Sequence, residues 1–204
     1  MAPAQPESDC TVNGHSLNLR DAFRALIETL AETGVPHAFI GALPVLAWGR
    51  VRATTDIDLV VTVGAEWGRW CAALAQRGMV ERKQIGPATA ADPLPDIAVF
   101  YSSGDPPVRI DVFVAKTDFE QAVVATAREA SVLGMTVRLA RPEASIIYKL
   151  LAQRRRDLDD VEGIFEARQA AGERLDWQFL DEWAAAWGIT DRLDPYRVKY
   201  GSPR

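Results

Sequence analysis

The sequence predicts an α/β (α+β) fold, in which a mixed β-sheet is flanked by helices and followed by a C-terminal helical region. Two patterns support this class. Up to residue 140, short apolar runs bounded by Gly and Pro alternate with segments of helical spacing, and from residue 141 onward only helical spacing recurs. The chain has 204 residues, 48% of them hydrophobic, which is enough for one sizeable core.

The same patterns divide the chain into three parts. Residues 1–18 are rich in proline and polar side chains, and we expect them to form a loose leader. Residues 19–140 form the domain that contains the sheet. Residues 141–204 form the helical region.

The expected elements of the sheet-containing domain end at Gly, Pro or polar turns. The first helix, for example, has apolar residues at helical spacing and stops before Gly34 and Pro36. Two strands that flank the stretch SSGDPP are typical of a β-hairpin. We expect helices at Leu19–Thr33, Leu43–Trp48, Glu66–Arg77 and Asp118–Arg128, and strands at His37–Ala42, Thr55–Val63, Met79–Ile85, Ile97–Tyr101, Val108–Val114 and Met135–Leu139.

The helical region begins at Pro142, a position where the missing N–H of proline costs little. We expect this first helix to carry Lys149 on a flank that can turn toward the cleft and to continue through the basic run from Arg154 to Arg156. Two further helices and a polar, turn-rich tail follow, at Asp157–Ala170, at Asp176–Trp187 and from Asp191 onward.

The composition argues against several classes of function. The net charge of −5 is unlike that of a general nucleic-acid binder, so any such contact needs a local basic patch. The two cysteines, Cys10 and Cys71, lack metal-ligand spacing, and the two histidines, His15 and His37, form no cluster, which argues against a zinc site or a Ser-His-Asp triad. No apolar run reaches the roughly 18 residues of a membrane span. We therefore expect a cytoplasmic protein with no membrane partner.

Two acidic residues, Asp56 and Asp58, alternate with apolar residues in the strand expected at Thr55–Val63. Because side chains of a strand alternate between its faces, both carboxylates project from one face, about 7 Å apart at their Cα atoms, while Ile57 points into the core. Carboxylates so placed repel each other unless a cation lies between them, and oxygen ligands suit a hard ion such as Mg²⁺. The competing interpretation is that the two acids only solvate an edge strand.

Two further residues favour a ligand site. Gly41 closes the preceding strand, and its missing side chain leaves room for a backbone N–H to approach a phosphate. Asp111 lies in the later apolar strand VRIDVFV, on the face opposite to Ile110, and supplies a third acid. The sequence therefore predicts a metal and phosphate site on these strands.

These residues resemble the nucleotidyltransferase superfamily, the fold of polymerase β and of the aminoglycoside nucleotidyltransferases. The resemblance rests on Gly-Ala at residues 41–42, on the stretch RATTDID at residues 52–58 and on Asp111. The stretch KLLAQRRRDLDDV, residues 149–161, is similar to the Lys…Arg-x-x-Asp-x-x-Asp segment of small bacterial nucleotidyltransferases of the AbiEii/MenT toxin type. That family usually has Gly-Gly or Gly-Ser at the turn, whereas Ala42 of this chain offers only its backbone N–H.

The resemblance implies that residues 19–140 are a catalytic domain with the nucleotidyltransferase fold. Such an enzyme moves a nucleoside monophosphate from an NTP to a hydroxyl and releases pyrophosphate. It implies two Mg²⁺ ions about 3.5–4 Å apart, with Mn²⁺ as an alternative. The acceptor stays open among an RNA or tRNA end, a protein side chain and a small molecule, and a toxin-type enzyme implies an antitoxin partner.

Roles for single residues also come from the resemblance. It assigns metal ligation and catalysis to Asp56, Asp58 and Asp111, of which Asp111 is either a ligand or the base. It assigns nucleotide binding to Gly41, Ala42, Arg52, Thr54 and Lys149. It places Arg156 and Asp160 behind these residues, where they would orient the side chains that bind the ligands.

Each auxiliary residue also has a plainer interpretation. Arg52 either pairs with Asp56 or is solvated, Lys149 is either a phosphate ligand or an exposed helix residue, and Asp160 is expected to pair with Arg156 one helical turn away. The run from Arg154 to Arg156 is either a solvated helix end or an RNA patch. For the whole chain, the alternative to an enzyme is a non-catalytic relative that binds a nucleotide or a protein.

Overall fold

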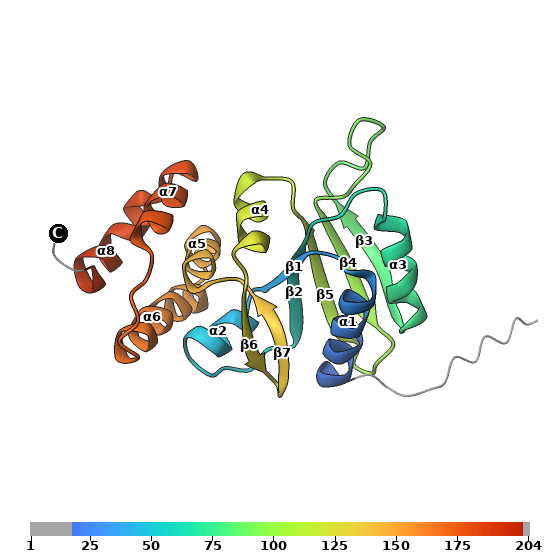
Figure 1. Cartoon of the computed structure of the whole chain (residues 1–204), viewed down its shortest axis with the longest axis horizontal. Coiled ribbons are helices and arrows are strands. Elements are labelled where there is room, and N and C mark those ends of the chain that lie inside the picture. The colour runs from blue at the N-terminus through green and yellow to red at the C-terminus, as the bar shows by residue number, and fades with distance from the viewer. Residues whose placement is uncertain (1–17, 202–204) are drawn as a thin grey trace, which may run out of the picture.

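The computed structural model describes residues 18–201, and seven strands within this range form one mixed sheet with helices on both faces (Figure 1). The predicted leader lies outside the described residues except for Asn18. The side chain of Asn18 caps the first helix, because its Oδ1 accepts a hydrogen bond of 3.1 Å from the N–H of Asp21. Within residues 18–201 no helix is both long enough and apolar enough to cross a membrane.

The sheet has the strand order β3-β4-β5-β2-β1-β7-β6. Its strands are β1 (His37–Ile40), β2 (Asp56–Val61), β3 (Met79–Ile85), β4 (Ile97–Ser102), β5 (Arg109–Val114), β6 (Arg128–Val132) and β7 (Met135–Leu139). The pairs β2–β5 and β1–β7 are parallel, and the other neighbouring strands are antiparallel. The helices are α1 (Leu19–Thr33), α2 (Leu43–Trp48), α3 (Trp67–Gln76), α4 (Asp118–Ala125), α5 (Pro142–Ala152), α6 (Arg155–Ala170), α7 (Trp177–Ala186) and α8 (Thr190–Tyr200).

Separate hydrophobic cores lie on the two faces of the sheet. On one face, Phe23 of α1 and Trp70 of α3 pack against Ile57 of β2. On the other face, Phe119 of α4 and Ile147 of α5 belong to a core that also includes residues of α6, α7 and α8. Figure 1 shows these two groups of helices on opposite sides of the strands.

The alternation of β2 decides which core each side chain meets. Ile57 and Leu59 are buried on the face that α1 and α3 cover, as the sequence predicts. Asp56 and Asp58 therefore project from the same face as Val60, which belongs to the core under the C-terminal helices. This placement brings α5 and α6, which lie about 90 residues later in the sequence, to the face that carries the acids.

The expected helix at Asp118–Arg128 is too long. It ends at Ala125, and Arg128–Val132 instead forms β6, an edge strand that the sequence analysis missed. Leu133 and Gly134 connect β6 to β7 with φ values of 53° and 77°, which is the backbone of a tight hairpin turn. A leucine at positive φ is rare, so the turn is difficult to recognise from sequence.

Two expectations for the helical region are also wrong. The basic run does not continue the helix of Lys149, because Gln153 adopts a left-handed φ of 51° and ends α5, so the run opens α6. The chain from Asp191 is not a turn-rich tail but part of α8. Tertiary packing stabilises this polar helix, since Leu193 is buried and the ring of Tyr200 stacks on Phe165 at 4.9 Å.

Candidate active site

Strand pairing brings the predicted acids together. In the parallel pair of β2 and β5, Asp58 lies directly opposite Asp111, and Asp56 lies opposite Arg109. Because paired residues on neighbouring strands share a face and the strands are about 4.8 Å apart, the carboxylates of Asp58 and Asp111 are neighbours. The local alternation of each strand predicts these faces, but the register that joins them is a long-range property.

Asp58 is the acid with the most constrained surroundings. Gly41 ends β1 beside it with a φ of 69°, and a Cβ at Gly41 would fall 2.0 Å from Oδ2 of Asp58. Burial, then the charges of Asp56 and Asp111, raise the pKa of Asp58 to about 6, although Lys149 and Arg109 act in the opposite direction. A cation beside Asp58 would therefore stabilise the charged form of its carboxylate.

Asp56 and Asp111 each have a partner on their own strand segment. The hydroxyl of Thr54 donates a hydrogen bond of 2.8 Å to Oδ1 of Asp56 and thereby orients it. The Nε of Arg109 donates a hydrogen bond of 2.8 Å to Oδ1 of Asp111, and this bond raises the pKa of Arg109. Arg109 shares a face with Asp111 by strand alternation, so it supplies a positive charge on the face that carries the three acids.

Ala42 stands at the start of α2, where the sequence resemblance places a phosphate-binding turn. It is the N-cap residue of a helix of six residues, it is buried, and no side chain caps this helix. The backbone of Gly41 and Ala42 therefore lies beside Asp58, but the contact that the structure shows at Gly41 is with Asp58 itself.

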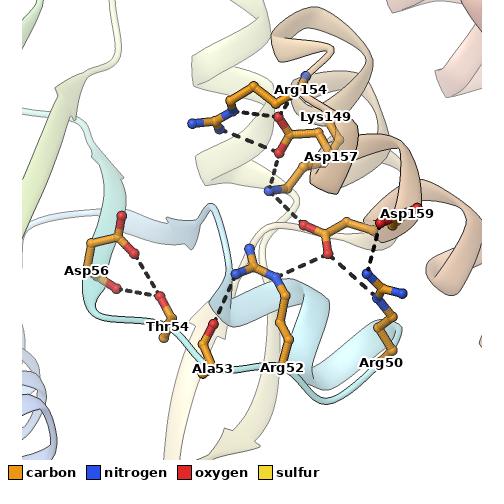
Figure 2. Close-up of polar contacts among 10 residues, drawn as sticks. Arg50, Arg52, Ala53, Thr54, Asp56, Lys149, Arg154, Asp157 and Asp159 are labelled. Atoms are coloured by element: carbon orange, nitrogen blue, oxygen red, sulfur yellow. Dashed lines mark hydrogen bonds and ion pairs between the residues drawn. The ribbon is translucent and has the colours of Figure 1, made fainter.

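Lys149 is buried, with a side chain that is only 6% exposed. Its Nζ donates a hydrogen bond of 2.9 Å to Oδ1 of Asp157 and lies 3.1 Å from Oδ2 of Asp160. Both carboxylates are completely buried. The plainer interpretation of Lys149 as an exposed helix residue is therefore wrong. Lys149 is a cation between two buried carboxylates, and Figure 2 shows its contact with Asp157.

Asp160 connects this cluster to the segment that precedes β2. The Nε of Arg52 lies 3.1 Å from Oδ1 of Asp160, and the Nε of Arg50 lies 4.0 Å from the same atom. These are ion pairs without hydrogen-bond geometry, since neither oxygen of Asp160 accepts a hydrogen bond within the described part of the chain. The predicted pair of Asp160 with Arg156 is wrong, and Arg52 follows neither of its two interpretations, a pair with Asp56 or solvation: Arg52 and Asp160 pair with each other.

Arg156 takes no part in this network. It is exposed at the start of α6, and among residues 18–201 it makes no ion pair. The neighbouring residue Arg154 does take part, because its Nε donates a hydrogen bond of 2.7 Å to Oδ2 of Asp157. Sequence analysis missed Arg154 and Asp157 as site residues, although the capping-box spacing of three residues joins them.

The oxygen atoms of the three acids are suitable ligands for a divalent metal, but in this conformation the described side chains are not arranged around a common metal position. Three carboxylates on one sheet face offer the oxygen ligands that Mg²⁺ prefers. Burial, and then the charges of Asp56 and Asp111, raise the pKa of Asp58, so a cation there would stabilise its charged form. Within residues 18–201, however, no three His, Cys, Asp or Glu side chains are arranged to hold a metal ion. Arg109 holds Asp111 and Thr54 holds Asp56, so metal binding requires at least Asp111 to turn from Arg109.

A cavity of about 530 Å³ lies elsewhere, among helices of the C-terminal region. Phe165, Trp177 and Tyr200 line it, and none of the three acids does. The chemistry-bearing residues therefore identify the candidate site better than the size of the cavity does.

Comparisons with known proteins bear on the family and the fold of the chain. A family model described as nucleotidyl transferase of unknown function (DUF2204) matches residues 19–191. The solution structure of the antibiotic-resistance factor ANT(2'')-Ia has a TM-score of 0.56 at 16% identity, over 87% of this chain and 95% of that one. The lincosamide antibiotic adenylyltransferase LnuA, bound to lincomycin, has a TM-score of 0.51 at 12% identity, over 74% of this chain and 98% of that one. A search of curated proteins finds no match.

The two levels of similarity support different statements. At these identities the solved structures show that the fold is that of a nucleotidyltransferase. The family model spans most of the chain and includes all three acids and the helices that face them. The chain therefore belongs to this family of nucleotidyl transferases of unknown function, and it is a nucleotidyltransferase.

Proposed function

We propose that the protein transfers a nucleoside monophosphate from a nucleoside triphosphate to a hydroxyl group, with Asp56, Asp58 and Asp111 as the acidic centre. The observation that carries this proposal is the in-register pairing of Asp58 with Asp111 on parallel strands, with Asp56 on the same face. Three carboxylates so placed repel one another unless cations compensate their charge. Position 41 accepts only glycine, because a Cβ there would collide with Asp58.

The chain's own residues have distinct parts in this reaction. Mg²⁺, as two ions or replaced by Mn²⁺, would be held by Asp56, Asp58 and Asp111 and would neutralise the phosphates and lower the pKa of the acceptor hydroxyl. The acceptor oxygen forms a bond to the α-phosphorus as the bond to the bridging oxygen breaks, and pyrophosphate leaves with that oxygen. If Asp111 acts as the base instead of as a ligand, its carboxylate would take the acceptor's proton once it is released from Arg109.

The chemical class of the acceptor substrate is open among several possibilities, whereas the donor is a nucleoside triphosphate. ANT(2'')-Ia, whose complex with adenylyl-2''-tobramycin has a TM-score of 0.51 at 19% identity over 80% of this chain and 93% of that one, and LnuA both act on antibiotics. A hydroxylated small molecule is accordingly one acceptor class for this chain. An RNA or tRNA end, or a protein side chain, follows instead from the toxin-type resemblance, which also implies an antitoxin partner in the cytoplasm.

One observation favours the alternative of a non-catalytic relative. Arg109 neutralises Asp111, and a chain that only binds a nucleotide or a protein could keep this pair permanently. In a working enzyme the pair must open for each turnover. Turnover itself therefore separates the two candidate functions.

The test is pyrophosphate release from each of the four NTPs with Mg²⁺ or Mn²⁺, in the presence of a cell extract as a source of acceptors. Labelled NTPs then show whether the label enters a nucleic acid, protein or small-molecule fraction. Asp58→Asn is the matched control, because it is isosteric and removes one carboxylate charge. Labelling by the wild type that disappears in Asp58→Asn supports the proposal, whereas NTP binding without any labelling supports the non-catalytic alternative.

A further inference from the structure

Two cations of the helical region, Lys149 and Arg154, differ sharply in their access to a ligand at the acids. The side chain of Lys149 is 6% exposed and that of Arg154 is 59% exposed. Lys149 is also already compensated, with carboxylates at 2.9 and 3.1 Å. A buried ammonium between two carboxylates has little left to offer a phosphate, whereas an exposed guanidinium can touch one.

Arg154 is held on one side only. Its Nε and Nη2 lie 2.7 and 3.5 Å from the two oxygens of Asp157, a side-on approach to the carboxylate. A guanidinium has five N–H donors, so this pair leaves the two on Nη1 free, and Nη1 makes no hydrogen bond within the described residues. Free donors in a fixed plane suit the oxygens of a phosphate.

The free side of Arg154 is directed to the acidic centre. The hydrogen bond that Arg154 donates to Asp157 is the largest cause of the raised pKa of Arg154. The charges of Asp157, then of Asp58 and Asp56, raise it further, so the guanidinium lies within electrostatic reach of both site acids. In Figure 2 the guanidinium points to the side on which Asp56 lies. A polyphosphate bound at the acids would therefore pass beside Arg154.

Two buried residues, Asp157 and Lys149, fix the orientation of the Arg154 side chain. Asp157 is completely buried, and although burial alone would raise its pKa, the hydrogen bonds from Arg154 and Lys149 hold the pKa of its carboxyl below the ordinary value. Asp157 also accepts the backbone N–H of Arg154 at 3.2 Å, which fixes the start of the side chain. Lys149 in turn prevents Asp157 from rotating, because it holds Oδ1.

We infer that Arg154 is the side chain that binds the polyphosphate of the nucleotide, and that Asp157 and Lys149 are positioning residues that aim it. This inference rests on the proposed nucleotidyl transfer. It differs from the sequence resemblance, which implies that Lys149 binds the triphosphate. Arg154 would bind the phosphates in both the ground state and the transition state. Its loss should therefore weaken binding more than it slows the chemical step.

The experiment measures the affinity of ATP and of inorganic tripolyphosphate by calorimetry in Mg²⁺, for the wild type and three variants. Arg154→Ala should weaken both ligands at least about tenfold, as expected for the loss of charge-assisted hydrogen bonds. Arg155→Ala is the matched control, because Arg155 is the next residue, is exposed and makes no ion pair in the described part of the chain, and its affinity should stay within about twofold. Arg154→Lys should lie between the two, since it keeps the charge and loses the side-on pair with Asp157.

A double-mutant cycle tests the positioning role. Asp157→Asn should weaken ATP binding in the wild-type background and have no further effect in the Arg154→Ala background. Equal ATP affinity for Arg154→Ala and the wild type overturns the inference while the proposed function stands, and equal affinity for Arg154→Lys and the wild type overturns the positioning role. A wild type that binds no NTP with Mg²⁺ or Mn²⁺ overturns the proposed function and this inference together.

Discussion

A Cβ added to Gly41 would lie 2.0 Å from Oδ2 of Asp58, closer than any side chain can approach without displacing that carboxylate. The pairing of Ile40 with Asp58 across β1 and β2 brings the turn after β1 to this acid. The glycine of the turn and the central acid therefore form one structural unit. The sequence analysis explains Gly41 by the access of a phosphate to the backbone. The structure gives a second reason, which holds without any ligand: a side chain at this position would collide with Asp58.

Gly41→Ala should abolish transfer activity while the protein remains folded. The alanine meets a left-handed backbone, which costs about 1 kcal/mol, and in addition pushes Asp58 from its place. Gly34→Ala is the matched control, because Gly34 has a φ of 66° and nothing within 4 Å of the added Cβ. We expect similar circular dichroism for both variants, a larger fall in melting temperature for Gly41→Ala, and activity only in Gly34→Ala. Full activity of Gly41→Ala would contradict the steric argument.

The free energy of unfolding should depend on pH because the charged form of Asp58 is unfavourable in the folded protein. Its pKa is about 6 in the folded protein, against an ordinary value of 3.8, so the folded state holds the proton more tightly than the unfolded state does. Without metal, the free energy of unfolding should therefore decrease as the pH rises from 3.8 to 6, and the penalty is complete above pH 6. Asp58→Asn should remove this penalty and raise stability at pH 7.5 by about 1–3 kcal/mol.

Urea unfolding at pH 4.5 and pH 7.5 in EDTA measures this effect. Asp194→Asn provides the control, since Asp194 is an exposed residue of α8 and should change stability by less than about 0.5 kcal/mol at either pH. If Asp58→Asn gains no stability at pH 7.5 relative to pH 4.5, the charge of Asp58 is already compensated in the metal-free protein.

Local patterns predicted most of this fold, and the failures have physical causes. The alternation in β2 is a property of the strand itself, so the shared face of Asp56 and Asp58 follows from sequence. The position of Asp111 opposite Asp58 depends on which strands pair and in which register, and no local pattern encodes that choice. For α8, stacking on Phe165 overrides a polar local sequence.

The ion-pair network shows the same limit. The sequence left Lys149 open between a phosphate ligand and an exposed helix residue, and neither interpretation includes its burial between two carboxylates. Its burial depends on Asp157 and Asp160, which α6 supplies after the break at Gln153. The spacing Asp157-x-x-Asp160 puts both acids on one helix face, but only the packing of α6 on α5 turns that face inward.

Lys149→Met should destabilise the protein, contrary to what an exposed lysine would do. The substitution keeps the volume and leaves two buried carboxylates without their shared cation, which costs about 3–5 kcal/mol. Lys83→Met, at an exposed position of β3, should change stability by less than about 0.5 kcal/mol. Denaturant titrations in the absence of ligand measure both. The double variant Lys149→Met/Asp160→Asn should recover part of the loss, and an additive double variant would show that the two side chains do not interact.

Arg109→Gln should tighten the binding of a divalent cation at the acidic centre. Arg109 now supplies the positive charge beside Asp111, so a metal ion must replace it, and the charge of Arg109 also acts on Asp58. Removing one positive charge near a site is worth about 1 kcal/mol at a few ångströms, or roughly a fivefold lower Kd. Calorimetric titration with Mn²⁺ in the absence of nucleotide gives this constant directly. Arg128→Gln, an exposed arginine of the edge strand β6, should leave it unchanged. Weaker Mn²⁺ binding by Arg109→Gln would show that Arg109 supports the metal-binding conformation of Asp111 and does not compete with the metal for it.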